Sequence, residues 1–185
     1  MLVLQIISAL LLFLNKYYVR REKAIGWIYG ILGAIAITIY FYFQMILQHK
    51  ENLWIMVVLD IALVFLMSYG YLIAAEKKGI FKKWNVLVKA IIVSITIFVC
   101  MLLLFEALTS KLVLVQFFFA ITLMFGTLLL AFKKKTTNII GWVLYLVASI
   151  ICTYIMIKTD SYIIAFFQIL SGLVAIDGIV KETKK

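Results

Sequence analysis

The sequence IGWIY at residues 25–29 returns almost unchanged as IGWVLY at residues 140–145. Each copy follows a basic cluster, lies at the head of an apolar stretch and is followed by one further apolar stretch. A parallel repeat in a hydrophobic chain is typical of small membrane transporters, in which the substrate site lies between the repeats. The repeat therefore predicts both the architecture and the position of the site.

The composition is that of a polytopic membrane protein. Apolar residues make up 66% of the 185 residues, charged residues 14%, and the mean hydropathy is +1.17. Long uncharged runs of this kind are typical of transmembrane helices rather than of a soluble core. The net charge of +10 comes from short loops, so it predicts orientation in the lipid bilayer rather than nucleic-acid binding.

Seven apolar stretches are each long enough to cross a bilayer. They cover residues 1–18, 24–47, 53–75, 85–107, 111–132, 138–157 and 161–180. At the end of the first stretch, Asn15 and Lys16 are expected to reach back to the membrane interface. Trp27, Trp54 and Trp84 are interpreted as interfacial belt residues. Gly26, Gly30 and Gly33 form a small-residue stripe suited to close helix packing.

The loop charges predict the direction of the chain. Fourteen of the eighteen basic residues fall in the first, third and fifth loops and the C-terminal tail, against three in the alternate loops. Because basic loops stay on the cytoplasmic side, the N-terminus is predicted outside and the C-terminus in the cytoplasm.

The first three stretches align with the last three and leave the fourth as a connector, which predicts an all-α 3+1+3 parallel repeat. The expected units are a first three-helix bundle at 1–80, a connector helix at 81–108, and a second bundle with a short tail at 109–185. The third and seventh stretches align without gaps, so that Asp60 matches Gln168 and Gly70 matches Gly178.

Three polar residues lie deep in these stretches and predict a central pocket. Asp60 is an ionisable group about 10 Å inside the third stretch, where it normally faces a cavity or a partner. Gln168 lies at the matching depth, and Ser149 shares a helix face with Trp142 and Tyr145. A purely structural role stays open for two of them. Ser149 can hydrogen-bond to the backbone of its own helix, and Gln168 can hydrogen-bond to a neighbouring helix.

Asp177 differs from these residues, since a local pair with Lys181 one turn away is expected. No metal or cofactor site is expected, because Cys100 and Cys152 lie in apolar runs and His49 lies in a loop without plausible partners. We expect no enzymatic activity for the same reason.

Three segments resemble the PnuC family of bacterial vitamin transporters, for which nicotinamide riboside uptake is typical. The third stretch, with LW at 53–54, LD at 59–60 and SYG at 68–70, resembles the family's aromatic, leucine-glutamine and tyrosine-glycine pattern. Trp142-x-x-Tyr145-x-x-x-Ser149 is similar to its Trp-x-x-aromatic-x-x-x-Asn motif. Tyr162, Gln168 and Asp177-Gly178 look like the family's aromatic, polar and polar-glycine positions.

The resemblance implies a SWEET-like fold in the bacterial inner membrane, with a central nucleoside-type site and passive transport followed by intracellular trapping. The family's glutamine is Asp60 here and its asparagine is Ser149. The substrate therefore stays open among nicotinamide riboside, thiamine, a flavin and a deoxynucleoside, and a homo-oligomer stays open as well.

The leading hypothesis is a facilitator for a small aromatic, cationic vitamin such as nicotinamide riboside. The ring would stack on Trp142 or Tyr145, and hydroxyls would bond Ser149 and Gln168. Asp60 would balance the cation, because no basic residue is expected inside any stretch. A proton-coupled carrier in which Asp60 titrates is the alternative. A non-transporting scaffold would leave Asp60 unexplained.

Overall fold

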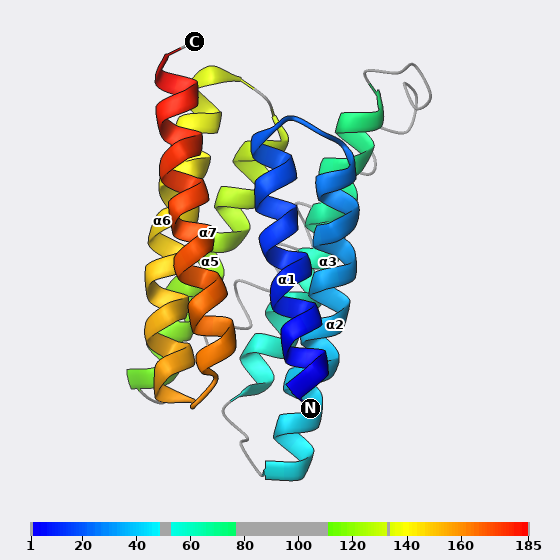
Figure 1. Ribbon diagram of the computed structural model, residues 1–185, viewed down its shortest axis with the longest axis vertical. Coiled ribbons are helices and arrows are strands. Elements are labelled where there is room, and N and C mark those ends of the chain that lie inside the picture. The colour runs from blue at the N-terminus through cyan, green and yellow to red at the C-terminus, as the bar shows by residue number, and fades with distance from the viewer. Residues whose placement is uncertain (1, 49–52, 77–110, 133, 185) are drawn as a thin grey trace.

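The computed structural model describes residues 2–48, 53–76, 111–132 and 134–184, and these form six α-helices without a strand. The helices are α1 (Leu2–Arg20), α2 (Ile25–Gln48), α3 (Trp54–Glu76), α5 (Lys111–Ala131), α6 (Lys135–Lys158) and α7 (Tyr162–Thr183) (Figure 1). All six are long and apolar enough to cross a membrane. Six of the expected stretches are thus confirmed as helices, and the fourth, 85–107, lies outside the described residues.

The apolar side chains of these helices face outward as well as inward. Every described helix carries large apolar residues that are exposed, among them Leu10, Leu32, Phe65, Phe118, Ile150 and Leu173. Polar residues such as Asn15, Lys16, Asp60, Ser149 and Gln168 are buried instead. A surface of this kind suits a bilayer, and it suggests a multi-pass membrane protein.

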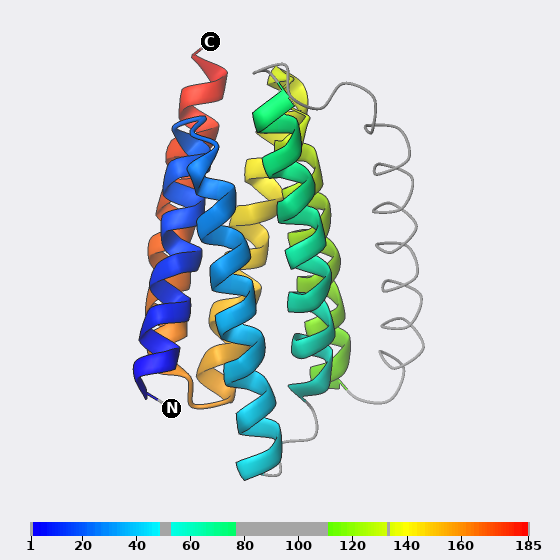
Figure 2. The same cartoon turned by 90° about the vertical axis from the view of Figure 1, so that its right-hand side faces the viewer.

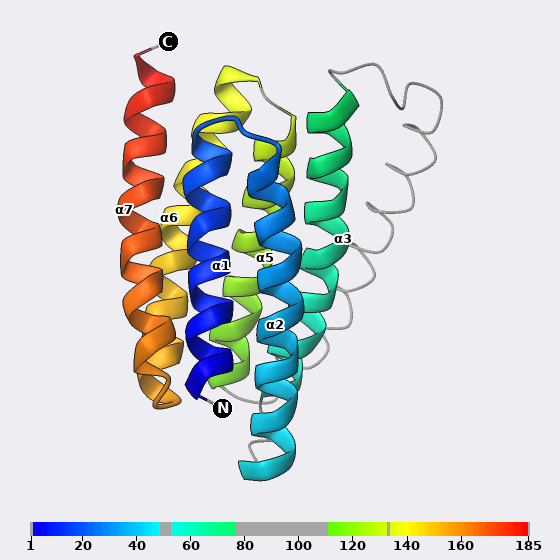
Figure 3. The ribbon, with the colours of Figure 1, turned by 45° about the vertical axis from the view of Figure 1, so that its right-hand side comes forward.

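The six described helices form a closed ring. Each packs against two others, in the order α1, α2, α3, α5, α6, α7 and back to α1 (Figure 2). We call α1–α3 the first half and α5–α7 the second half. The halves meet twice, once where α3 packs on α5 and once where α1 packs on α7 (Figure 3).

Tight turns make the neighbouring helices antiparallel. After α1, Glu22 adopts a positive φ of 58°, and Lys23 donates its backbone N–H to the carbonyl of Tyr18 at 3.0 Å. After α6, Asp160 has a φ of 57°, and the N–H of Ser161 bonds the carbonyl of Met156 at 2.8 Å. These bonds satisfy carbonyls that the helix ends leave unpaired.

The ends of the ring differ in charge. Arg20, Lys134 and Lys181 lie at the end that also holds the C-terminus, which we call the basic end. The N-terminus and the turn between α6 and α7 lie at the opposite end.

Two tryptophans pack on two glycines at equivalent places in the halves. Trp27 of α2 covers Gly70 of α3, and Trp142 of α6 covers Gly178 of α7, so closely that an added Cβ would overlap each indole ring. Both tryptophans are 3% exposed. The interfacial interpretation of Trp27 is therefore wrong, because the missing side chain of Gly70 leaves room for the indole inside the bundle. Trp54 is partly buried, and Trp84 lies outside the described residues.

The small-residue stripe of α2 packs closely, as predicted. A Cβ at Gly26 would meet the backbone of α1 at Tyr18 and Val19, and one at Gly33 would meet Leu12. Gly30 lies against Asn15 of α1 and Met67 of α3. The stripe thus lets α1 and α2 approach closely.

Candidate functional site

A small cavity lies at the centre of the ring, and all six described helices line it. Its volume is about 30 Å³. Most of the lining is apolar, from residues such as Leu12, Phe41, Leu63, Leu123 and Ile164. The polar part comes from Asn15, Lys16, Asp60, Tyr145, Ser149 and Gln168. The polar groups of both halves therefore converge on one enclosed space.

Four of the five residues that the sequence singles out line this cavity, and one does not. Asp60, Tyr145, Ser149 and Gln168 are in its wall. Trp142 lies two turns before Ser149 on α6, toward the basic end, where it lines a second small cavity together with Trp27. The shared helix face was predicted correctly, but the periodicity does not say how far along that face the cavity extends.

Lys16 is the largest departure from expectation. It is 6% exposed, and its ammonium donates hydrogen bonds to Gln168 Oε1 at 3.1 Å and to Ser149 Oγ at 3.5 Å. The same nitrogen lies 5.1 Å from the centre of the Tyr145 ring. The prediction that Lys16 reaches back to the membrane interface is therefore wrong. The two acceptors and the Tyr145 ring face take the place of water around its charge. A basic residue thus lies inside a span, contrary to the premise of the cation hypothesis.

A signal in the sequence could have found Lys16. Four polar residues of α1 recur at helical spacing and are buried, namely Gln5, Ser8, Asn15 and Lys16. In a chain surrounded by lipid, a polar stripe on an apolar helix marks the face that turns inward. That stripe predicts which face of α1 turns inward. The expected reach of Lys16 to the membrane interface rests only on its closeness to the helix end.

Asn15, beside Lys16, is held by a different contact. Its Nδ2 donates to the carbonyl oxygen of Gly26 at 2.9 Å. This bond joins α1 to α2 next to the cavity and does not compete for the polar groups of α6 and α7.

The Tyr145 ring is fixed by a hydroxyl chain from α5. Thr127 Oγ1 donates to its own helix at the carbonyl of Leu123, at 2.7 Å. Since that proton is used, Thr127 accepts from the Tyr145 hydroxyl at 2.9 Å. The chain holds the ring face toward the Lys16 ammonium.

Asp60 carries an unsatisfied atom. The residue is 7% exposed, and its Oδ2 has no hydrogen-bond partner among the described residues. No ion pair joins it to Lys16; within the described part of the chain, the ion pairs are Arg20–Asp177 and Lys181–Glu22. A buried polar atom without a partner is costly, so a native one calls for an explanation.

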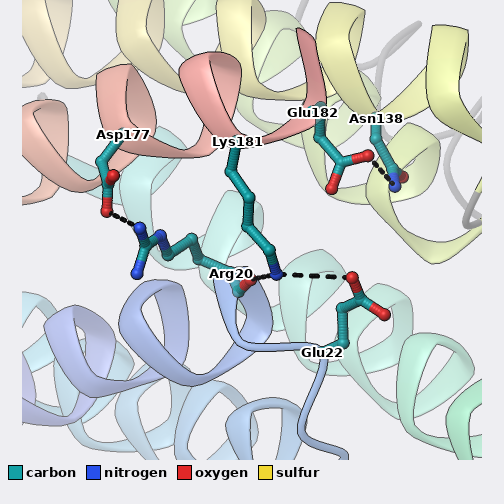
Figure 4. Close-up of polar contacts among 6 residues, drawn as sticks. All are labelled: Arg20, Glu22, Asn138, Asp177, Lys181 and Glu182. Atoms are coloured by element: carbon teal, nitrogen blue, oxygen red, sulfur yellow. Dashed lines mark hydrogen bonds and ion pairs between the residues drawn. The ribbon is translucent and has the colours of Figure 1, made fainter. Parts of the chain in front are cut away.

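Contacts between the halves close the basic end. Arg20 of α1 pairs with Asp177 of α7. Lys181 donates to the carbonyl of Arg20 at 3.0 Å and to Glu22 Oε1 at 3.4 Å (Figure 4). The expected local pair of Asp177 with Lys181 is wrong, because Arg20 on the neighbouring helix is the partner.

The second small cavity adjoins these ion pairs, since Arg20 and Glu22 both line it. Its wall includes Arg20, Trp27, Asn138, Trp142 and Glu182. Asn138 Nδ2 donates to Glu182 Oε2 at 3.4 Å within the second half. Both tryptophans thus stand between the central cavity and the basic end.

A hydroxyl contact joins the halves at the opposite end. Gln44 Nε2 donates to the Tyr40 hydroxyl at 2.6 Å, so Tyr40 donates onward to Ser161 Oγ at 3.3 Å. Tyr40 is on α2, and Ser161 precedes α7. Polar contacts between the halves thus lie on both sides of the cavity.

Comparison with protein-family models, with curated proteins and with solved structures finds no match to this chain.

Proposed function

We propose that this chain is a membrane facilitator for a small vitamin or nucleoside-type substrate, with nicotinamide riboside as the first candidate, and that it is not an enzyme. The central cavity is the substrate site in this proposal. One observation carries it: the Lys16–Gln168 hydrogen bond of 3.1 Å, between two buried residues of opposite halves at the centre of a ring of membrane-length helices. Buried polar groups in such a place typically mark a substrate pathway.

The 3+1+3 parallel repeat belongs to the same proposal. Exchanging α1–α3 for α5–α7 leaves the neighbour order of the ring unchanged. The same exchange relates the packing of Trp27 on Gly70 to that of Trp142 on Gly178. Both observations support a pseudo-twofold axis along the membrane normal and a SWEET-like arrangement, with residues 81–108 as connector.

The size of the cavity implies that transport requires helix movement. About 30 Å³ holds roughly one water molecule, whereas ligand pockets typically measure ~300 Å³ or more. The described conformation is therefore closed to a nucleoside. In the proposed cycle, the Tyr40–Ser161 contact opens on one side and the Arg20–Asp177 contact on the other.

Asp60, Tyr145, Ser149 and Gln168 are the proposed substrate-binding residues within the cavity. Trp142 would meet the substrate on its way to the basic end, since it lies in the wall of the second cavity. The basic end is proposed to face the cytoplasm. Lys16 is buried and no longer counts as a loop residue. The first, third and fifth loops and the tail then hold thirteen basic residues against three in the alternate loops, so the charge bias between the two sides remains. The proposed location is the bacterial inner membrane.

Counterflow into proteoliposomes tests the proposal. Vesicles loaded with an unlabelled compound should accumulate the same labelled compound for at least one of nicotinamide riboside, thiamine, riboflavin and deoxyadenosine. The uptake should not respond to a proton gradient. Uptake no faster than in protein-free vesicles for all four compounds would contradict a vitamin or nucleoside facilitator.

A proton-coupled carrier is the second candidate, and the unpaired Oδ2 of Asp60 in the cavity favours it. Lys16 is a second titratable group in the same wall. In this case an inward proton gradient should speed net uptake several-fold, and a protonophore should abolish the increase. Uptake that is independent of the gradient excludes coupling.

A further inference from the structure

The central cavity holds two ionisable side chains of opposite sign. Lys16 and Asp60 both line it, and they are 6% and 7% exposed. Each is held apart from the other, since no ion pair joins them. The formal charge of the described wall is therefore zero while its two charged positions remain separate.

This separation restricts the charge of a ligand. A net charge in a cavity surrounded by helices and lipid is costly unless an opposite charge lies beside it. A monovalent cation would be balanced by Asp60, but Lys16 would then leave an excess positive charge in the site. A ligand with one charge of each sign keeps the sum at zero and provides a partner for both side chains.

The hydrogen-bonding groups around Lys16 form a receptor for an anion. An ammonium has three N–H donors, and Gln168 and Ser149 accept two of them. Among the described residues no other acceptor bonds the ammonium, so its third donor remains for an incoming carboxylate. The hydroxyl of Ser149 can turn to donate to the same group.

The groups around Asp60 suit the opposite end of such a ligand. Its unpaired Oδ2 can accept a hydrogen bond or balance a cationic ring. The Tyr145 face, which the Lys16 ammonium now covers at 5.1 Å, offers a surface for the same ring once Lys16 turns toward a carboxylate.

We propose that the substrate is a zwitterion, with a carboxylate that binds Lys16, Ser149 and Gln168 and a cationic ring or amine that binds Asp60. This inference rests on the proposed function and narrows its substrate class. It favours a pyridinium nucleoside that bears a carboxylate over the same nucleoside bearing a carboxamide.

Two compounds form a matched pair for the test. Nicotinic acid riboside and nicotinamide riboside share the pyridinium ring and the ribose, and they differ only in carboxylate against carboxamide. Binding of both to the full-length protein in nanodiscs is measured by titration calorimetry. A charge-assisted hydrogen bond in a buried site corresponds to about a ten- to hundredfold tighter binding of the zwitterion.

Variants assign the two charges separately. Lys16→Met should abolish the preference for nicotinic acid riboside, because the anion loses its partner. Asp60→Asn should weaken both compounds by a similar factor, because both carry the same cation. Lys134→Met, which removes an exposed lysine far from the cavity, should change neither value. Lys16→Gln serves as a second variant, and a monodisperse elution profile establishes folding for each protein.

The outcomes separate the two proposals. Equal or tighter binding of nicotinamide riboside by the wild-type protein overturns the zwitterion inference and leaves the proposed function standing. A preference for the zwitterion that persists in folded Lys16→Met and Lys16→Gln overturns the role of Lys16. If the protein binds neither riboside and exchanges none of the four counterflow substrates, the proposed function itself is overturned.

Discussion

Lys16 of α1 donates a hydrogen bond to Gln168 of α7 across 3.1 Å, which joins the two halves at the centre of the ring. The bond lies on the wall of the central cavity, where both residues are more than nine-tenths buried. A charged donor and a neutral acceptor in such a place couple the two helices that close the ring, α1 and α7.

This coupling should be measurable by a double-mutant cycle of Lys16→Met and Gln168→Leu. Hydrogen bonds to charged groups contribute about 1.5–3 kcal/mol, so the coupling in the free energy of unfolding should fall in that range. Denaturation in mixed micelles gives the four free energies. The cycle of Lys134→Met with Gln168→Leu should show no coupling, and additivity in the Lys16 cycle would contradict the bond.

The tryptophan–glycine contacts predict a pattern among glycine substitutions. Gly70→Ala and Gly178→Ala should each destabilise the protein by about 1–3 kcal/mol, because the new methyl group overlaps the indole of Trp27 or Trp142. Gly172→Ala is the matched control, since its Cβ would meet Leu146 and Ser149 at ordinary distances of 3.6 and 3.7 Å. Thermal denaturation in detergent distinguishes them, and equal effects at all three glycines would refute the contacts.

Cysteine labelling tests the proposed orientation. In a background without Cys100 and Cys152, Lys158→Cys should react in intact cells with a maleimide that cannot cross the membrane, and Lys134→Cys should not. Both positions are exposed and lie at opposite ends of the ring. Two other positions on the predicted outer side are not used for the cysteine. Ser161 is fully buried, and His49 lies outside the described residues. The reverse labelling pattern would invert the topology.

The helices could be predicted from the sequence because their signal is local. Runs of about 20 apolar residues determine a membrane-length helix whatever surrounds them. The observed bounds of the six described helices therefore lie within a few residues of the expected ones. The face of α6 that holds Tyr145 and Ser149 was predictable for the same reason, since helical spacing alone sets it.

Lys16, Trp27 and Asp177 were mispredicted because their environment depends on other helices. Periodicity shows which residues share a face, but not whether that face turns to lipid or to the ring interior. Trp27 is buried because Gly70, distant in sequence, leaves room for its indole. Asp177 pairs with Arg20 because α1 packs on α7. Such partners follow from the ring, not from neighbours in the sequence.

The contact at the basic end should control access to the cavity. Asp177→Asn removes the ion pair with Arg20. Both side chains of this pair are partly exposed, Arg20 at 24% and Asp177 at 53%. An exposed pair contributes at most about 1 kcal/mol, so opening toward the basic end should rise by up to about fivefold. The rate at which a methanethiosulfonate reagent modifies Cys152 reports this opening in a Cys100→Ala background. An unchanged modification rate would show that the ion pair does not hold the basic end closed. Lys134→Gln is the control, because it removes a charge without removing this pair.

In the proposed transport cycle the cavity opens to each side of the membrane in turn, and Cys152 tests this alternation whichever compound is transported. This thiol lines the cavity and is 3% exposed, and it is the single cysteine left in a Cys100→Ala variant. A charged methanethiosulfonate reagent is added to sealed right-side-out vesicles and, separately, to inside-out vesicles. Alternating access predicts slow modification of Cys152 from both sides, and a bound substrate should protect the thiol. Modification from neither side, or from one side only, would contradict alternating access.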